Sequence, residues 1–287
     1  MTRSQATFVG FGAILLWSFL ALFAVGATEV PALQLNAMCF SIGGAIGLIW
    51  GAKTGGIRTL RTISWKVYAF GATGLFGYHL LYFSALRLAP AAEAGLIAYL
   101  WPLLIVLFSG FLPGEQLRRG HIIGGLIAFT GAAVLITGGD AGYDPDNLPG
   151  YGLALLCAIT WAGYSVLSRR LGAVPTDSVT VFCLLAACMS VGAHFLLETT
   201  VWPSSSLAWA AVIALGTGPV GLAFFIWDIG VKRGDIQLLG VLSYAAPVLS
   251  TIVLILAGVA PATIALLVAA TLIAGGAALA ARASAKN

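Results

Sequence analysis

The chain has 287 residues, of which 60% are hydrophobic and only 8% are charged. Soluble domains carry about 25% charged residues, so this composition excludes a soluble globular protein and indicates one that crosses a membrane several times. The formal net charge of +4 does not indicate a nucleic-acid partner, because of where the basic residues lie.

Ten apolar segments follow one another, joined by short stretches rich in Gly, Pro and charge. Each is long enough to cross a hydrocarbon core of about 30 Å as a helix that rises about 1.5 Å per residue. The predicted spans are 6–26, 33–52, 67–88, 91–112, 121–138, 151–171, 177–197, 207–230, 236–257 and 261–281. We therefore predict an all-α integral membrane protein with ten transmembrane helices.

Ten crossings place both termini on one side of the membrane. Of the 14 Lys and Arg residues, all except Arg87 fall on that side. The loops on the other side hold the acidic residues Glu29, Asp140, Asp144, Asp146 and Glu198. This asymmetry follows the positive-inside rule and predicts cytoplasmic termini in a bacterial inner membrane. It also explains the net charge without a nucleic-acid partner.

The ten spans divide into two sets of five, in residues 1–138 and 151–287, joined by a predicted periplasmic loop at 139–150. Because five is odd, the second half must cross the membrane in the opposite sense to the first. The stretch Tyr99-Leu-Trp-Pro102 matches Tyr244-Ala-Ala-Pro247, and Trp17 has a counterpart in Trp161. Inverted repeats of this kind are typical of secondary transporters, whose substrate site lies near the midplane.

Small residues recur every four positions in several spans. Examples are Gly120, Gly124, Ala128 and Ala132 in the fifth span, and Ala270, Ala274 and Ala278 in the tenth. Such stripes let helices approach closely in lipid. We expect them to pack within the chain. A homodimer is equally compatible with the sequence, so the oligomeric state stays open.

Polar and aromatic residues gather at mid-span depth, where they usually face a bundle interior or a wet cavity. Tyr78, His79 and Tyr82 share one face of the third span. The other candidates for the lining of a substrate cavity are Trp17, Tyr99, Trp101, Trp161, Tyr164, Ser243 and Tyr244. On a regular helix Tyr99 and Trp101 point to nearly opposite sides, so we expect only one of them to face this cavity.

An aromatic lining suits a flat apolar or zwitterionic solute, since ring faces offer stacking and cation–π contact. No Lys or Arg lies at midplane, which disfavours phosphorylated substrates. His79 has two readings: it bonds a substrate carboxylate or carries protons, or it is a neutral imidazole bonded inside the bundle. Asp228 lies four residues before Lys232, so we expect an ion pair on one helix face.

Several spans contain residues that interrupt a helix. They are Pro102, Gly216, Gly218, Pro219 and Pro247. Such breaks either flex as hinges during alternating access or form static kinks that fit the packing.

Enzymatic and metal-binding roles are not expected. The four cysteines (Cys39, Cys157, Cys183 and Cys188) lie in apolar segments without metal-ligand spacing, so we predict no disulfide and no metal. We recognise no nucleophile–base pair at depth and no phosphate-binding loop, so we predict no catalytic residue and no cofactor. A membrane scaffold without transport activity would leave the deep polar residues unexplained.

The chain resembles the EamA-type ten-helix members of the drug/metabolite transporter superfamily. The resemblance rests on the paired halves, on Trp17 and Trp161, on Ala89-Pro-Ala-Ala92, and on the turn Leu112-Pro-Gly-Glu115 after the fourth span. The counterpart of this turn, Ala257-Gly-Val-Ala-Pro261, lacks the acid. Within the superfamily the chain looks most like the aromatic amino-acid exporters.

This resemblance implies export of aromatic and other neutral amino acids, and sometimes drugs, through a central cavity. Trp17, Trp101, Trp161 and Tyr244 would then stack on the substrate side chain. The polar end would be bound by Tyr78, His79, Tyr82, Tyr99 and Ser243. A lipophilic-drug exporter of the same fold is the alternative.

Overall fold

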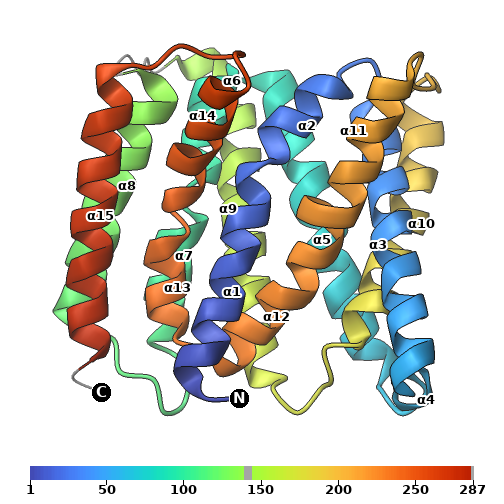
Figure 1. Ribbon diagram of the computed structural model, residues 1–287, viewed down its shortest axis with the longest axis horizontal. Helices are drawn as coiled ribbons and strands as arrows, with labels where there is room; N and C mark the ends of the chain where they lie inside the picture. The colour runs from blue at the N-terminus through green and yellow to red at the C-terminus, as the bar shows by residue number, and fades with distance from the viewer. Residues whose placement is uncertain (139–143, 286–287) are drawn as a thin grey trace.

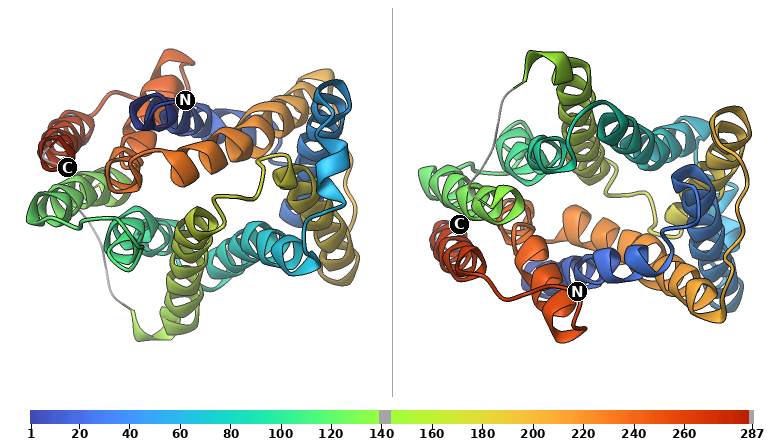
Figure 2. Two further views of the ribbon diagram at one scale, coloured as in Figure 1. Left: turned by 90° about the horizontal axis from the view of Figure 1, so that it is seen from below. Right: turned by 90° about the horizontal axis from the view of Figure 1, so that it is seen from above.

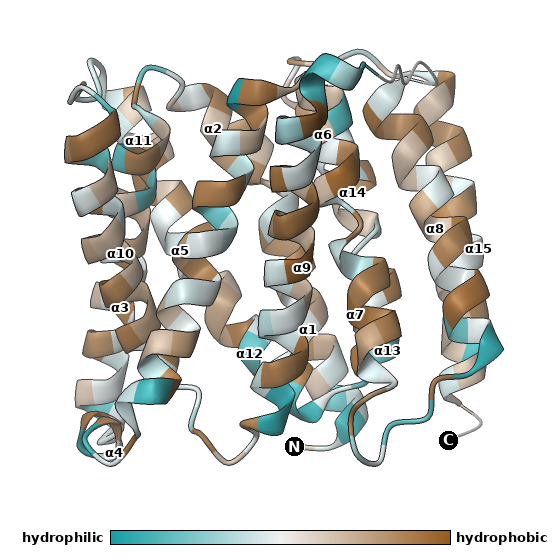
Figure 3. Cartoon of the chain, turned by 180° about the vertical axis from the view of Figure 1, so that it is seen from behind, coloured by the Kyte–Doolittle hydropathy of each residue, from teal (hydrophilic) through white to brown (hydrophobic). Residues whose placement is uncertain are grey.

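The computed structural model describes residues 1–138 and 144–285, which form helices and no strand. The long helices stand side by side, and both termini lie at the same face of the bundle (Figure 1), here called the terminal face. Hydrophobic residues dominate the helices, whereas hydrophilic ones gather toward their ends (Figure 3). The predicted all-helical membrane architecture is thereby confirmed.

The first half contains α1 (Arg3–Ser18), α2 (Leu20–Gly26), α3 (Ala32–Thr54), α4 (Ile57–Leu60), α5 (Trp65–Leu88), α6 (Ala91–Ala98), α7 (Trp101–Ser109) and α8 (Arg119–Thr137). The second contains η1 (Pro145–Asn147), α9 (Leu148–Arg170), α10 (Ser178–Leu197), α11 (Ser206–Thr217), η2 (Gly218–Leu222), α12 (Ala223–Arg233), α13 (Ile236–Leu242), α14 (Ala245–Leu256) and α15 (Ile264–Ser284). Within the predicted connecting loop, residues 139–143 lie outside the described residues.

Nine helical stretches in the described part of the chain are long and apolar enough to cross a membrane. The remaining predicted span is α5, whose 24 residues are long enough. It is less apolar because it carries Tyr78, His79 and Tyr82 in its interior. The protein therefore has nine or ten membrane-spanning helices, and the least apolar of the candidates carries the predicted polar face.

Viewed along the helix axes, most helices form two facing rows (Figure 2). Row one contains α1, α11, η2, α12, α13 and α14, and row two contains α5, α6, α7 and α9. One end of the rows is closed by α8 with α15, and the other by α3 with α10.

The first five predicted spans can be paired, in chain order, with the last five. Exchanging the two members of every pair leaves the pattern of helix contacts unchanged. Helix α5 packs on α9 as α12 packs on α1, and α5 meets α10 as α11 meets α3. Likewise, α7 contacts α9 as α14 contacts α1. The start of α1 and the end of α9 lie at the same face, because Arg3 and Arg169 both contact Glu115. These two helices, the first of each predicted half, therefore run in opposite directions.

Four spans are interrupted, between α1 and α2, between α6 and α7, at the π-helical segment η2, and between α13 and α14. A proline lacks the N–H that a helix interior needs, and its ring crowds the preceding turn. Pro219 lies inside η2. Pro102 lies just after the break between α6 and α7, and Pro247 lies just after the break between α13 and α14. At the end of α1 the Ser18 hydroxyl donates to the Leu15 carbonyl at 2.6 Å, a bond that often bends helices.

Glycines permit the closest helix crossings. A Cβ on Gly10 of α1 would lie 2.8 Å from the Gly230 Cα of α12. On α8, a Cβ on Gly124 would lie 2.5 Å from the Gly276 carbonyl oxygen of α15. The stripe predicted on the fifth span therefore packs within the chain.

The stripe of small residues predicted on the tenth span lies on the wrong face of the helix. The buried face of α15 carries Ala269, Ile273, Gly276 and Ala280, whereas Ala274 and Ala278 are exposed. A repeat of four residues fits two faces of an Ala-rich helix equally well, and only the partner helix distinguishes them.

Candidate functional site

A cavity of about 480 Å³ lies between the two rows, in the half of the bundle away from the terminal face. Its lining begins at the mid-depth indoles of Trp17, Trp101 and Trp161 and continues along α2, the first turns of α3 and α14. Small-molecule sites are typically concave, mostly apolar and about 300–1,000 Å³ in volume. The position between two helix rows and the volume both fit a solute site.

Most of the predicted site residues meet in this lining. They are Trp17, Tyr78, His79, Tyr82, Tyr99, Trp101 and Trp161, together with Pro219 and Pro247 from the predicted helix breaks. The fold brings them together from both rows. None of the lining side chains, all within the described residues, is Asp, Glu, Lys or Arg.

The expectation that only one of Tyr99 and Trp101 faces the cavity is wrong, because both line it. Helix α6 ends at Ala98 and α7 begins at Trp101, so the two residues do not belong to one continuous helix. Their rings lie 6.4 Å apart. The break redirects the chain between them.

Three predicted residues are buried but lie outside the lining. The Tyr244 hydroxyl accepts a hydrogen bond from the Leu103 N–H at 3.1 Å, and so caps a backbone donor in the first turn after the break. The Ser243 hydroxyl donates to the Leu239 carbonyl at 2.8 Å. Tyr164 stacks behind Trp161, with their ring centroids 5.3 Å apart. Pro102, Gly216 and Gly218 also lie outside the lining.

Four tryptophans pack together at the end of the cavity toward the terminal face, three of them in its lining and Trp227 buried behind them, and this cluster is here called the tryptophan floor. Trp17 and Trp227 come from row one, and Trp101 and Trp161 from row two. Ring centroids lie 5.8 Å apart for Trp17 and Trp161, 5.1 Å for Trp17 and Trp227, and 5.9 Å for Trp101 and Trp227. Edge and tilted contacts of this kind stabilise aromatic clusters. Trp227 was not among the predicted site residues, because the sequence places it nearer the helix end.

His79 has a defined hydrogen bond. Its Nδ1 lies 2.8 Å from the Leu75 carbonyl oxygen, which can only accept, so Nδ1 carries the proton of this bond. The ring packs edge-on against Phe40 and Tyr78. A neutral imidazole in this tautomer leaves Nε2 as a hydrogen-bond acceptor for a solute.

Other lining residues were not predicted. They include Asn36, Cys39, Phe83, Phe224, Ser250 and Thr251. Asn36 gave a usable signal, since an amide inside an apolar span needs a partner, and it donates to Ser190 at 2.9 Å. Phe83 and Phe224 gave none, because phenylalanine is common in lipid-facing and packed positions alike.

A second hollow, of about 280 Å³, lies outside the cavity wall. It is lined by Leu16, Phe19, Phe23, Ala214, Thr217, Gly218 and Pro219. Pro219 belongs to the lining of both the cavity and this hollow.

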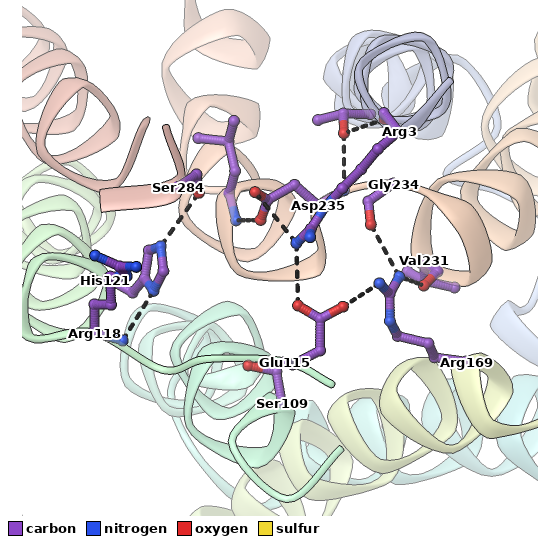
Figure 4. A network of polar contacts seen from close by, with 12 residues as sticks. Arg3, Ser109, Glu115, Arg118, His121, Arg169, Val231, Gly234, Asp235 and Ser284 are labelled. Atoms are coloured by element: carbon purple, nitrogen blue, oxygen red, sulfur yellow. Dashed lines mark hydrogen bonds and ion pairs between the residues drawn. The ribbon is translucent and has the colours of Figure 1, made fainter. Parts of the chain in front are cut away.

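Beyond the tryptophan floor, a network of charged side chains joins the two rows at the terminal face (Figure 4). Arg3 of α1 binds Glu115 at 3.0 Å and approaches Asp235 at 3.5 Å. Arg169 of α9 binds the other oxygen of Glu115. It also donates to the carbonyls of Val231 and Gly234, at 2.8 and 2.9 Å, at the end of α12. The predicted Gly-Glu turn therefore places its acid in a contact that closes this face.

A model of the EamA-like transporter family matches the chain twice, over residues 5–137 and 148–282. The chain belongs to this family of transporters. It is therefore a multi-pass membrane transporter and not an enzyme. The expected resemblance to the drug/metabolite transporter superfamily is confirmed.

The transporter is 56% identical to the aromatic amino acid exporter YddG of Ancylobacter novellus, over 98% of each chain. It is 30% identical to the aromatic amino acid exporter YddG of Escherichia coli, over 88% of each chain. A solved crystal structure with 54% sequence identity superposes on it with a TM-score of 0.93, covering 97% of this chain and 98% of that one.

Proposed function

We propose that this transporter exports aromatic amino acids. The observation that carries the proposal is a mid-membrane cavity lined by Trp17, Trp101, Trp161 and three tyrosines, without an Asp, Glu, Lys or Arg among the described lining residues. Such a lining favours a ring-bearing solute whose own charges cancel. Two relatives named aromatic amino acid exporters support the same substrate class.

In this proposal the indoles of Trp17, Trp101 and Trp161 stack on the substrate ring. The hydroxyls of Tyr78, Tyr82 and Tyr99 bind its carboxylate, and Nε2 of His79 accepts from its ammonium. Tyr164 and Tyr244 act from behind the lining, where they hold Trp161 and the start of α7 in place, while the Ser243 hydroxyl bonds to the Leu239 carbonyl of its own span.

We further propose that residues 1–138 and 151–287 are inverted five-helix repeats joined by a periplasmic loop at 139–150. The separate family matches of the two halves and the exchange pattern of helix contacts support this arrangement. The concentration of Lys and Arg on the terminal face supports a cytoplasmic location for it. The cavity then opens to the periplasm, and the breaks near Pro102, Gly216, Gly218, Pro219 and Pro247 absorb the change of shape.

Uptake of radiolabelled tryptophan into inverted membrane vesicles tests the substrate. We expect uptake that depends on the transporter and that excess unlabelled phenylalanine and tyrosine inhibit. His79→Ala and Tyr82→Ala should each reduce it, whereas Trp209→Ala, outside the lining and 39% exposed, should not. Transport of a lipophilic cation without any transport of tryptophan would instead support a drug exporter.

A further inference from the structure

A buried ion pair lies on the closed side of the cavity floor. Lys232 Nζ and Asp228 Oδ2 are 2.9 Å apart on α12, as the four-residue spacing predicts, and their side chains are 4% and 1% exposed. Phe224, one helical turn before Asp228, lines the cavity, and the buried Trp227 packs against Trp17 of the lining. The ion pair therefore lies next to the end of the cavity, on the side of the terminal face.

The pair is incompletely satisfied. Asp228 Oδ2 accepts from the Thr176 hydroxyl at 2.7 Å, and Lys232 Nζ donates to the Val174 carbonyl at 2.9 Å. Asp228 Oδ1 has no hydrogen-bond partner although it is buried. A buried oxygen without a partner costs free energy, and a buried ion pair seldom stabilises a fold more than apolar residues do. Stability alone therefore does not explain why two charges occupy this position.

The proposed inverted repeat gives Asp228 a counterpart in the first half of the chain. The shift of 145 residues that superimposes Tyr99 on Tyr244 also superimposes Tyr82 on Trp227 and Phe83 on Asp228. Both Tyr82 and Phe83 line the open cavity. When the transporter opens toward the terminal face, Asp228 would take the place in the wall that Phe83 has in the present conformation.

We propose that the Asp228–Lys232 pair binds the charged end of the amino acid when the cavity opens toward the terminal face. The Asp228 carboxylate accepts from the α-ammonium, and the Lys232 ammonium donates to the α-carboxylate. A zwitterion offers the two charges that the pair now offers itself, so each buried charge keeps a partner throughout the exchange. The substrate ring would lie toward Trp227 and Trp161. This inference rests on the proposed function as an amino-acid exporter.

The test measures how the transporter recognises each charge of the substrate. Tryptophan uptake into inverted vesicles, which present the terminal face to the medium, is inhibited with unlabelled tryptophan, indole-3-propionate (no ammonium) or tryptamine (no carboxylate). In the wild type we expect each analogue to inhibit at least about tenfold more weakly than tryptophan, the effect of one charge-assisted hydrogen bond. In Asp228→Asn, indole-3-propionate should inhibit uptake as strongly as unlabelled tryptophan does. In Lys232→Met, tryptamine should do so.

The chain offers a matched control. His194 of α10 and Glu198, the residue that follows this helix, have the same spacing, lie 2.9 Å apart and are 6% and 4% exposed, but they lie outside the cavity lining. Glu198→Gln should lower thermal stability and leave the inhibition ratios unchanged.

The outcomes separate the two proposals. If Asp228→Asn and Lys232→Met keep the wild-type inhibition ratios, the pair is a structural contact and the inference is overturned. The double variant Asp228→Leu/Lys232→Leu removes both charges together and so covers poor folding of the single variants. In this variant both analogues should inhibit uptake as strongly as tryptophan does. Weaker inhibition by either analogue contradicts the inference. If the wild type does not transport tryptophan, the proposed function itself fails, and this inference fails with it.

Discussion

At the scale of residues, the tryptophan floor is one of the places where the two helix rows touch, beside the packing of α7 on α13. Each row contributes two indoles, and the Trp227 N–H of row one donates to the Ser165 hydroxyl of row two at 3.1 Å. The Trp17 N–H donates to the Pro219 carbonyl at 3.0 Å, which ties α1 to η2. The tryptophan floor therefore both ends the cavity and holds its walls together.

Trp101→Ala should raise the KM for tryptophan about two- to twelvefold. The substitution removes one stacking surface, and an aromatic pair contributes about 0.5–1.5 kcal/mol beyond its buried area. Uptake measured over a range of tryptophan concentrations checks this. Trp209→Ala is the control, and an unchanged KM for Trp101→Ala would remove this indole from the substrate contact.

Much of the lining could be predicted at this scale. Tyrosine, histidine and tryptophan stand out within apolar spans, because polar groups at depth need partners. Trp227 escaped prediction because it lies toward the end of its predicted span, 207–230. The direction of Trp101 relative to Tyr99 depends on a break that a regular helical pattern does not contain. The missing information is therefore backbone geometry rather than residue type.

At the scale of elements, the interrupted helices are unevenly distributed. In row one α1 is followed by a break, and α11 is separated from α12 by η2. Their counterparts α9 and α5 in row two are continuous. The crossing of α1 and α12, at Gly10 and Gly230, lies between these breaks and the terminal face.

Gly10→Ala should destabilise the transporter by about 1–3 kcal/mol, the usual cost of overpacking. The new methyl group would lie 2.8 Å from the Gly230 Cα, so the backbones of both helices must separate. Thermal unfolding in detergent measures the effect. Gly163→Ala on α9 is the matched control, because nothing lies within 4 Å of its Cβ position. A Tm for Gly10→Ala equal to that of Gly163→Ala would contradict the close crossing.

The order of the spans could be predicted because hydrocarbon thickness sets the length of each apolar segment. The packing face of α15 could not, because Ala270, Ala274 and Ala278 satisfy the same spacing as the residues that are actually buried. Helix breaks were only partly predictable. Pro219 marks η2, whereas no proline lies at the break after Ser18.

At the scale of the whole molecule, charged contacts between the two rows close the terminal face. At the terminal face, Glu115 of the turn after α7 links Arg3 in row one to Arg169 in row two. The corresponding turn in the second half, near Ala260, lacks an acid. The one-sided Gly-Glu turn therefore gives an electrostatic closure to the terminal face.

Glu115→Gln should shift the transporter toward opening at the terminal face, because Arg3 and Arg169 lose a shared counter-charge. Ser168→Cys provides the reporter, since Ser168 is only 2% exposed and lies two turns beyond Trp161 on α9. In a background with the native cysteines replaced, labelling by an impermeant thiol reagent should accelerate about tenfold, which corresponds to about 1.4 kcal/mol. Glu29→Gln, at the opposite face, should leave the rate unchanged. Equal labelling rates for Ser168→Cys alone, with Glu115→Gln and with Glu29→Gln would show that the network does not hold this face closed.

Pro219 separates two environments with a single side chain. It borders the solute cavity on one side and, on the other, the hollow lined by Phe19 and Phe23. Among the described residues, Pro219 is the one common to the two linings. A change in the geometry of η2 therefore alters the inner and the outer hollow together.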